Sequence, residues 1–178
     1  GDIDIAQYLI TLFYFYALPM IMMAVLAFFI QVISPNKFVG MLIFVGYFIA
    51  SLTFSQLGFE HNLWNFGASP QLVYSDMNGY GWYMQIHNWY MLYWGALCVV
   101  LSVLGYALWQ RGPQVSLKSR IKLLNYQLGK GGKVAVASAA LVFVLAGSNI
   151  YYNTRVLNEF RTADQGLDAQ AEYEKIYA

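Results

Sequence analysis

The chain has few charged side chains and a single cysteine. Charged residues make up 11% of the sequence, whereas roughly a quarter is typical of soluble domains. Hydrophobic residues make up 59%, so the composition predicts a membrane protein. Because Cys98 is the only cysteine, a disulfide within the chain is excluded, and its apolar surroundings predict a small buried side chain. The formal net charge of +1 is uninformative about nucleic acid, and no dense basic cluster indicates nucleic-acid binding, so no nucleic-acid partner is expected.

The sequence also lacks the common catalytic and metal-binding motifs. Glu60 and His61 are adjacent, but the residues that follow do not complete a His-Glu-x-x-His zinc motif, so a hydrogen-bonded pair is favoured over a metal site. Asp76-Met77-Asn78-Gly79 begins like a calcium loop but lacks the downstream acids, so it predicts a turn. There is no phosphate-binding loop and no Gly-x-Ser-x-Gly elbow. We therefore assign no catalytic, cofactor-binding or metal-binding residue to this chain.

Four long uncharged stretches divide the sequence. They lie between Asp4 and Lys37, Lys37 and Glu60, Asp76 and Arg111, and Lys133 and Arg155. Each can supply the roughly 20 apolar residues that a helix needs to cross the hydrocarbon core. In lipid the backbone must satisfy its own hydrogen bonds, so we predict transmembrane helices at about 8–33, 38–57, 83–109 and 134–152.

These stretches predict an all-α integral membrane fold with a transmembrane domain over 1–152 and a polar tail or linker over 153–178. Pro19 removes a backbone donor and predicts a kink in the first helix. Ser34-Pro35-Asn36-Lys37 predicts a tight polar turn between the first two helices.

The segment between the second and third predicted helices is rich in aromatic residues and glycine, and both histidines lie in or just after it. We predict a structured aromatic loop at one membrane face. The candidate functional residues of this loop are Glu60, His61, Trp64, Tyr74, Asp76, Asn78, Gly79 and His87. Two histidines on one side of a membrane would also suit haem ligation, and Asp76 with His87 would suit a proton relay, but structural roles at the interface are favoured.

The segment from Gln110 to Lys133 contains six basic residues and no acid. Its apolar residues Leu117, Ile121, Leu124 and Leu128 recur at the spacing of one helix face. This pattern predicts an amphipathic helix over about 115–128 that lies on the membrane, with a solvated loop as the alternative. Gly129, Gly131 and Gly132 are expected to loosen the chain before the last helix.

The distribution of Lys and Arg predicts the orientation in the membrane. If the basic segment is cytoplasmic, seven of the ten Lys and Arg residues lie inside and all nine acids lie outside. The aromatic loop and both termini are then extracytoplasmic. The chain begins at Gly1 and no short basic-then-apolar signal peptide opens it, so we expect a piece of a larger protein.

Several motifs resemble those of one protein family. The first is Tyr74-Ser75-Asp76-Met77-Asn78-Gly79-Tyr80-Gly81, and the second is Tyr151-Tyr152-Asn153-Thr154-Arg155-Val156-Leu157-Asn158. Glu60-His61-Asn62-Leu63-Trp64-Asn65-Phe66-Gly67 and Tyr93-Trp94 are similar too. The family consists of large bacterial inner-membrane proteins in which an ABC-2-type permease region is fused to a C-terminal zinc aminopeptidase of the M1 clan. The resemblance covers most of 55–178, and the first two helices match only in character. One departure is Trp82-Tyr83-Met84, where a His-Phe pair would be expected.

The resemblance implies that this chain is the last membrane portion before the peptidase, in a bacterial inner membrane with both termini periplasmic. Zinc is then expected only in the attached peptidase domain, because the family's zinc ligands have no counterpart here. The partners implied are the lipid bilayer, an ATP-binding cassette subunit and further copies of the chain. The alternative function is a membrane anchor or assembly subunit of a larger complex, without transport activity.

Overall fold

The computed structural model describes residues 5–53, 61–70, 74–75, 79–109, 116–158 and 163–177. Its elements in chain order are α1 (Ile5–Ile10), η1 (Thr11–Ala17), α2 (Leu18–Ile33), α3 (Lys37–Thr53), α4 (Gly81–Leu108), α5 (Leu117–Gln127), α6 (Gly129–Tyr151), η3 (Tyr152–Val156) and α7 (Ala163–Tyr177). Within these ranges the strand-type pairing is a single bridge between Ser75 and Gly79. The predicted all-α architecture is confirmed for this part of the chain.

Three helical stretches are long and apolar enough to cross a membrane. They are Ile5–Ile33, Gly81–Leu108 and Gly129–Val156, with 29, 28 and 28 residues. They correspond to the first, third and fourth helices predicted from the sequence. The second predicted helix corresponds to α3, which is apolar but has only 17 residues. Residues 54–57, which the prediction also placed in this helix, lie outside the described part.

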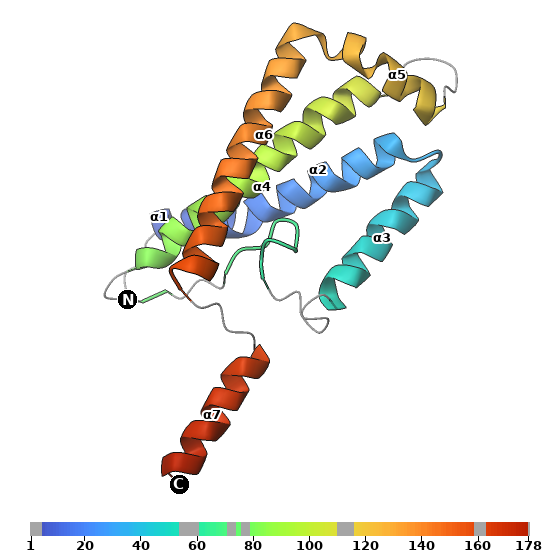
Figure 1. The fold of residues 1–178 in the computed structure, drawn as a ribbon. Helices are drawn as coiled ribbons and strands as arrows, with labels where there is room; N and C mark the ends of the chain where they lie inside the picture. Colours follow the sequence, from blue (N-terminus) through green and yellow to red (C-terminus); the bar gives the residue numbers. More distant parts are fainter. Residues whose placement is uncertain are drawn as a thin grey trace.

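Helix α4 is the centre of the bundle. It packs against α6 along one side and against α2 along another, while α3 packs against α2 (Figure 1). The turn between α2 and α3 is the polar one that the sequence predicts. In this turn the Ser34 hydroxyl donates to the Ile30 carbonyl at 2.7 Å, and Asn36 Oδ1 accepts from the Val39 N–H at 3.0 Å. Helix α3 then diverges from α2 toward the loop end of the bundle (Figure 1).

Small residues bring α4 and α6 close together. Ala96 of α4 and Ala139 and Ala146 of α6 are buried. Gly147 of α6 faces the ring of Tyr93 on α4. Small residues at helix contacts are typical of membrane bundles, because close backbone approach gives van der Waals packing where lipid removes the hydrophobic driving force.

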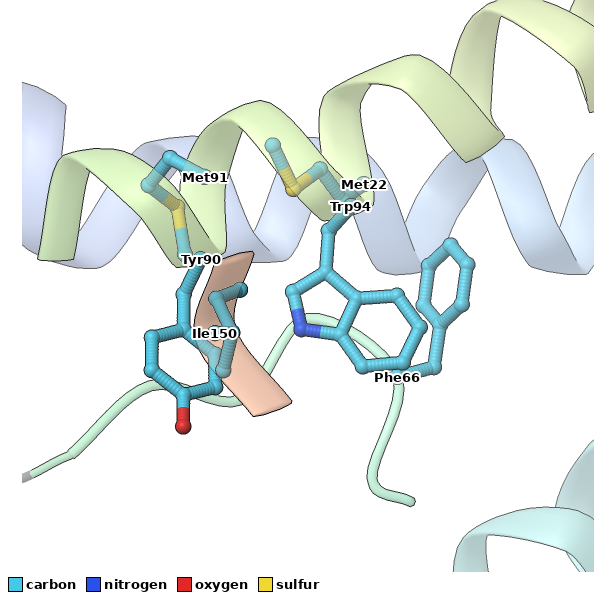
Figure 2. Close-up of a cluster of buried hydrophobic side chains, with 6 residues drawn as sticks. All are labelled: Met22, Phe66, Tyr90, Met91, Trp94 and Ile150. Atoms are coloured by element: carbon cyan, nitrogen blue, oxygen red, sulfur yellow. The ribbon is translucent and has the colours of Figure 1, made fainter. Parts of the chain in front are cut away.

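A cluster of buried apolar side chains joins the helices to the loop. Met22 comes from α2, Phe66 from the loop, Tyr90, Met91 and Trp94 from α4, and Ile150 from α6 (Figure 2). The Phe66 and Trp94 ring centroids are 5.1 Å apart, and Trp94 Nε1 donates to the Ala68 carbonyl at 2.9 Å. The loop is therefore packed into the bundle by an aromatic anchor with a satisfied polar group.

The outside of the bundle is covered by large apolar side chains. On α3, Phe38 and Leu42 are 71% and 72% exposed, and on α6 Val134 is 67% exposed. Contiguous apolar surface of this kind is unfavourable in water but suits contact with lipid tails. The outer surface is therefore compatible with a membrane location.

Helices α5 and α6 differ from the prediction in their boundaries. Helix α5 spans Leu117–Gln127, and the Ser116 side chain accepts a hydrogen bond from the Ser119 N–H at its start. Gly129 has a positive φ of 58°, at the point where the chain turns between α5 and α6. Gly131 and Gly132 lie inside α6, so the expected loose segment before the last helix is wrong for these two glycines.

The predicted apolar stripe of α5 is divided in the structure. Leu117, Leu124 and Leu128 are half-buried, but the side chain that turns fully inward is Arg120, which is 8% exposed. Ile121 is 52% exposed. Beyond η3, α7 occupies most of the polar tail, for which the sequence had suggested only a tail or linker.

Candidate functional site at the loop end of the bundle

The described part of the loop, residues 61–70, is held by backbone turns and by contacts to two helices. The Trp64 N–H donates to the His61 carbonyl and the Ala68 N–H donates to the Asn65 carbonyl, both at 3.0 Å. Gly67 has a φ of 76°, which favours glycine. The Phe66 N–H donates to the Tyr47 hydroxyl of α3 at 3.1 Å, so the loop bridges α3 and α4.

A second turn lies just before α4. The Ser75 N–H donates to the Gly79 carbonyl at 2.9 Å, and the Gly79 N–H donates to the Ser75 carbonyl at 2.7 Å. The Tyr74 hydroxyl donates to Gln7 Oε1 at 3.2 Å, and the Tyr74 ring lies 5.3 Å from that of Tyr80. These contacts dock the turn on the first span. Asp76 and Asn78, between the paired residues, lie outside the described part.

At Gly79 a side chain should destabilise this turn. Its φ is 57°, a conformation that costs an L residue about 1–2 kcal/mol. We expect Gly79→Val to lower the free energy of unfolding by at least that amount, measured by thermal unfolding in detergent. Gly46→Val in α3 is the matched control, because nothing lies within 4 Å of its added Cβ and its φ is not positive. Equal, small effects at both positions would mean that the turn does not contribute to stability.

His61 is buried, and both of its ring nitrogens have partners. Its Nδ1 accepts from the Leu63 N–H at 3.2 Å, so Nε2 carries the proton and donates to Thr154 Oγ1 at 3.0 Å. Thr154 in turn donates to the Ile150 carbonyl at 2.8 Å. Burial lowers the pKa of His61 below its usual range, and the positive charge of Arg155 acts in the same direction. The neutral ring is therefore a polar link between the loop and the end of the last span.

His87 lies on α4 and is 1% exposed. Its Nδ1 is 2.9 Å from the Ser69 hydroxyl of the loop, and its ring makes edge contacts with Tyr14 and Phe15 at centroid distances of 5.0 and 4.7 Å. Its Nε2 is buried and has no hydrogen-bond partner among the described residues. His87 therefore links the loop to the first span and keeps one unused polar atom.

Each histidine contacts a segment of π-helix. Tyr14 and Phe15 belong to η1, where the Leu18 N–H donates to the carbonyl of Phe13, five residues earlier. Thr154 belongs to η3, where the Leu157 N–H donates to the carbonyl of Tyr152 at 3.0 Å. π-Helical turns are rare and occur frequently at functional sites. The sequence predicts a kink at Pro19. In the structure Pro19 lies in the first turn of α2, directly after the π-helix η1.

The structure separates the predicted site residues into several environments. His61 and His87 face different partners, Trp64 is 60% exposed, and Tyr74 is 43% exposed. Glu60, like Asp76 and Asn78, lies outside the described part. A haem or metal ligand at His61 would have to displace an existing hydrogen bond on either nitrogen. Within the described ranges no three His, Cys, Asp or Glu residues are grouped as a metal site.

Sequence reasoning missed the partners of both histidines. Thr154 lies within one of the motifs that carry the family resemblance, so that motif was a usable signal. Ser69, Tyr14 and Phe15 have no distinguishing pattern in the sequence. Their roles depend on the packing of elements 18 or more residues apart. Chemically, the arrangement offers a buried imidazole at His87 whose Nε2 is unpaired among the described residues, and a second at His61 whose two nitrogens are hydrogen-bonded.

Comparisons with protein-family models, with curated proteins and with solved structures find no match to this chain.

Proposed function

We propose that this chain is the permease-like membrane portion of an ABC-transporter-type protein that holds a periplasmic zinc aminopeptidase domain. The observation that carries the membrane part is the apolar outer surface of three helices, each long enough to cross a bilayer. The transporter and peptidase parts rest on the motifs of the loop and of Tyr151–Asn158. In the structure the bond from His61 to Thr154 joins the Glu60–Gly67 motif to the Tyr151–Asn158 motif.

The proposal includes a fourth crossing by α3. Its exposed apolar residues and its polar turn to α2 support a helical hairpin in the membrane. At about 1.5 Å per residue its 17 described residues are slightly short of the hydrocarbon thickness, so residues 54–57 would complete the crossing. The loop, both termini and the tail would then be periplasmic, and α5 cytoplasmic.

Cysteine labelling tests this topology. Ser119 on α5 and Gln165 on α7 are both exposed, so a cysteine at either position should react with a maleimide. In a Cys98→Ala background, we expect an impermeant reagent added to whole cells to label position 165 and to leave position 119 unlabelled until the cells are opened. Since α6 alone separates the two positions, labelling of both from the same side would exclude the crossing by α6 and with it the four-crossing topology.

Helix α5 is the proposed contact for an ATP-binding subunit. Arg120 fixes it to the bundle by donating through Nη1 to the carbonyls of Val32 and Leu108, both at 2.8 Å. Lys118, Lys122 and Tyr126 remain exposed on the outer side. Because α5 is fixed to the bundle, it can transmit a movement of a bound ATP-binding subunit to the membrane helices. Its exposed lysines can also contact anionic headgroups.

The alternative is an anchor or assembly subunit without transport. It is favoured by the packing between α2, α4 and α6, where Met22, Met91 and Trp94 fill the described centre (Figure 2). A solute path would then have to involve further helices or further copies. Co-purification separates the two functions, since only the transporter requires an ATP-binding subunit whose ATPase activity depends on this chain.

Peptidase assays test the tethering proposal. Zinc aminopeptidase chemistry needs three protein ligands that hold an open zinc site, together with a general base. We expect purified residues 1–178 to release no amino acid from a peptide substrate with zinc present, and a form extended past Ala178 to gain that activity. Zinc-dependent activity of residues 1–178 that is abolished by His61→Ala would instead identify the loop as a metal site.

A further inference from the structure

A cavity of about 350 Å³ lies between the start of α4 and the end of α6. Helix α4 contributes the rings of Trp82, Trp89 and Tyr90 to its lining. Trp82 and Trp89 are about two helical turns apart and therefore lie on one face of the helix, with Tyr90 next to Trp89. The volume is within the range of about 300–1,000 Å³ that is common for small-molecule sites.

The other part of the lining consists of side-chain amides. Asn149, Asn153 and Asn158 come from α6 and the segment after it, and Gln85 comes from α4. Asn153 Nδ2 donates to the Asn149 carbonyl and Asn158 Nδ2 donates to the Asn153 carbonyl, both at 2.8 Å. Oδ1 of Asn153, Oδ1 of Asn158 and the amide of Gln85 have no partner among the described residues. Asn153 and Thr154 of the π-helix η3 both line the cavity, and the bond from His61 to Thr154 links η3 to the loop.

The uncharged lining of the cavity limits the class of ligand that it can bind. None of the described residues that line this cavity is charged. A phosphate or a carboxylate would lose its hydration here without gaining a charged partner, which is unfavourable. Flat aromatic faces beside amides that both donate and accept instead suit a ligand with an apolar face and a rim of hydroxyl groups.

We propose that this cavity binds a neutral pyranose ring. The axial C–H groups of the sugar lie against the indole of Trp82, and its hydroxyls donate to Oδ1 of Asn153 and Asn158 and bond to the amide of Gln85. The ring belongs either to a soluble oligosaccharide or to the headgroup of a glycolipid, since both present the same chemistry. This site does not depend on transport or on a peptidase domain, and its test is independent of both.

Sugar titration of the full chain tests the site. The protein is placed in phosphatidylcholine nanodiscs, so that no sugar detergent competes, and maltose binding is followed by tryptophan fluorescence. We expect a saturable change, and Trp82→Leu should weaken binding about threefold to tenfold. Trp82 is 77% exposed, so this substitution leaves the fold intact. Trp64→Leu is the matched control, because Trp64 is also exposed and lies outside this cavity.

Two further arms complete the design. Sorbitol carries hydroxyls but no ring, and we expect it to produce no saturable change. A nanodisc that contains glucosyl-diacylglycerol should weaken the apparent affinity for maltose if the site reaches a lipid headgroup, and should leave it unchanged if only soluble sugar enters. Either result supports sugar binding and identifies its source. The proposal is overturned if maltose gives no saturable change, if sorbitol gives the same curve, or if Trp82→Leu binds like the parent protein.

Discussion

Arg120→Met is expected to lower the free energy of unfolding by about 3 kcal/mol, because it leaves one buried and one partly buried carbonyl without their charged donor. Arg120 Nη1 donates to Val32 near the end of α2 and to Leu108 at the end of α4. The last carbonyls of a helix have no partner within the helix, and they carry the negative end of its dipole. The Arg120 guanidinium therefore gives one hydrogen bond to the C-terminal end of α2 and one to that of α4, and it holds α5 against both helix ends.

In the part of the chain that the structure describes, the acceptors of the Arg120 guanidinium are backbone carbonyls and not carboxylates. The sequence contains no acid between Asp76 and Glu159, and the residues in contact with Arg120 are neutral carbonyls. Two helix C-termini thus take the place of a carboxylate. Its Nε is buried and makes no hydrogen bond to the described residues, so the arginine is held by Nη1.

Lys122→Met is the control for Arg120→Met, because Lys122 lies exposed on the same helix and its loss removes the same charge. Thermal unfolding in one detergent should show a large shift for Arg120→Met and almost none for Lys122→Met. Arg120→Lys should recover only part of the loss, since an ammonium lacks the planar fork of the guanidinium. Matching shifts for the two methionine variants would mean that net charge, and not the link between helix ends, is responsible.

Charge gaps predicted most of the helical architecture because a long apolar run in lipid has few alternatives to a helix. The run between Asp76 and Arg111 became α4, and its predicted start at 83 differs from Gly81 by two residues. The last helix starts earlier than predicted, at Gly129 instead of 134, and of its first glycines only Gly132 packs against neighbouring side chains. The predicted residues 54–57 of the second helix stay untested.

Apolar periodicity could not reveal the inward position of Arg120. The pattern of Leu117, Ile121, Leu124 and Leu128 implies an apolar face, and an arginine between these residues is expected to point outward. Its partners are backbone carbonyls 12 and 88 residues away, which carry no side-chain signal. The π-helices η1 and η3 could not be predicted for a similar reason. A hydrogen bond to the fifth preceding residue replaces one to the fourth, and this change needs no particular composition.

The candidate loop was located by composition, but its internal connections were not. Histidine, tryptophan and glycine in one segment indicated a structured loop, and Gly79 with its positive φ agrees with the predicted turn. The hydrogen bonds from His61 to Thr154 and between His87 and Ser69 depend on how three helices meet. Only the three-dimensional packing of the bundle brings those residues together.

Gly147→Leu is expected to separate α4 from α6 and to lower the free energy of unfolding by about 3 kcal/mol, at the upper end of the range for overpacked cores. A Cβ at position 147 would lie 2.9 Å from Cε2 of Tyr93. The Tyr93 ring cannot easily move away, because it stacks on Phe143 at a centroid distance of 4.2 Å. Any shift therefore has to move the helices themselves.

Gly131→Leu in the same helix is the control for Gly147→Leu, because nothing lies within 4 Å of its added Cβ. It should be neutral or slightly stabilising, since leucine is the better helix former. Tyr93→Ala should rescue Gly147→Leu, because removal of the ring opens space for the new side chain. A double-mutant cycle in detergent would give a favourable coupling between the two changes if the clash is the cause. Strict additivity would show instead that Gly147 contributes through the flexibility of α6 and not through its contact with α4.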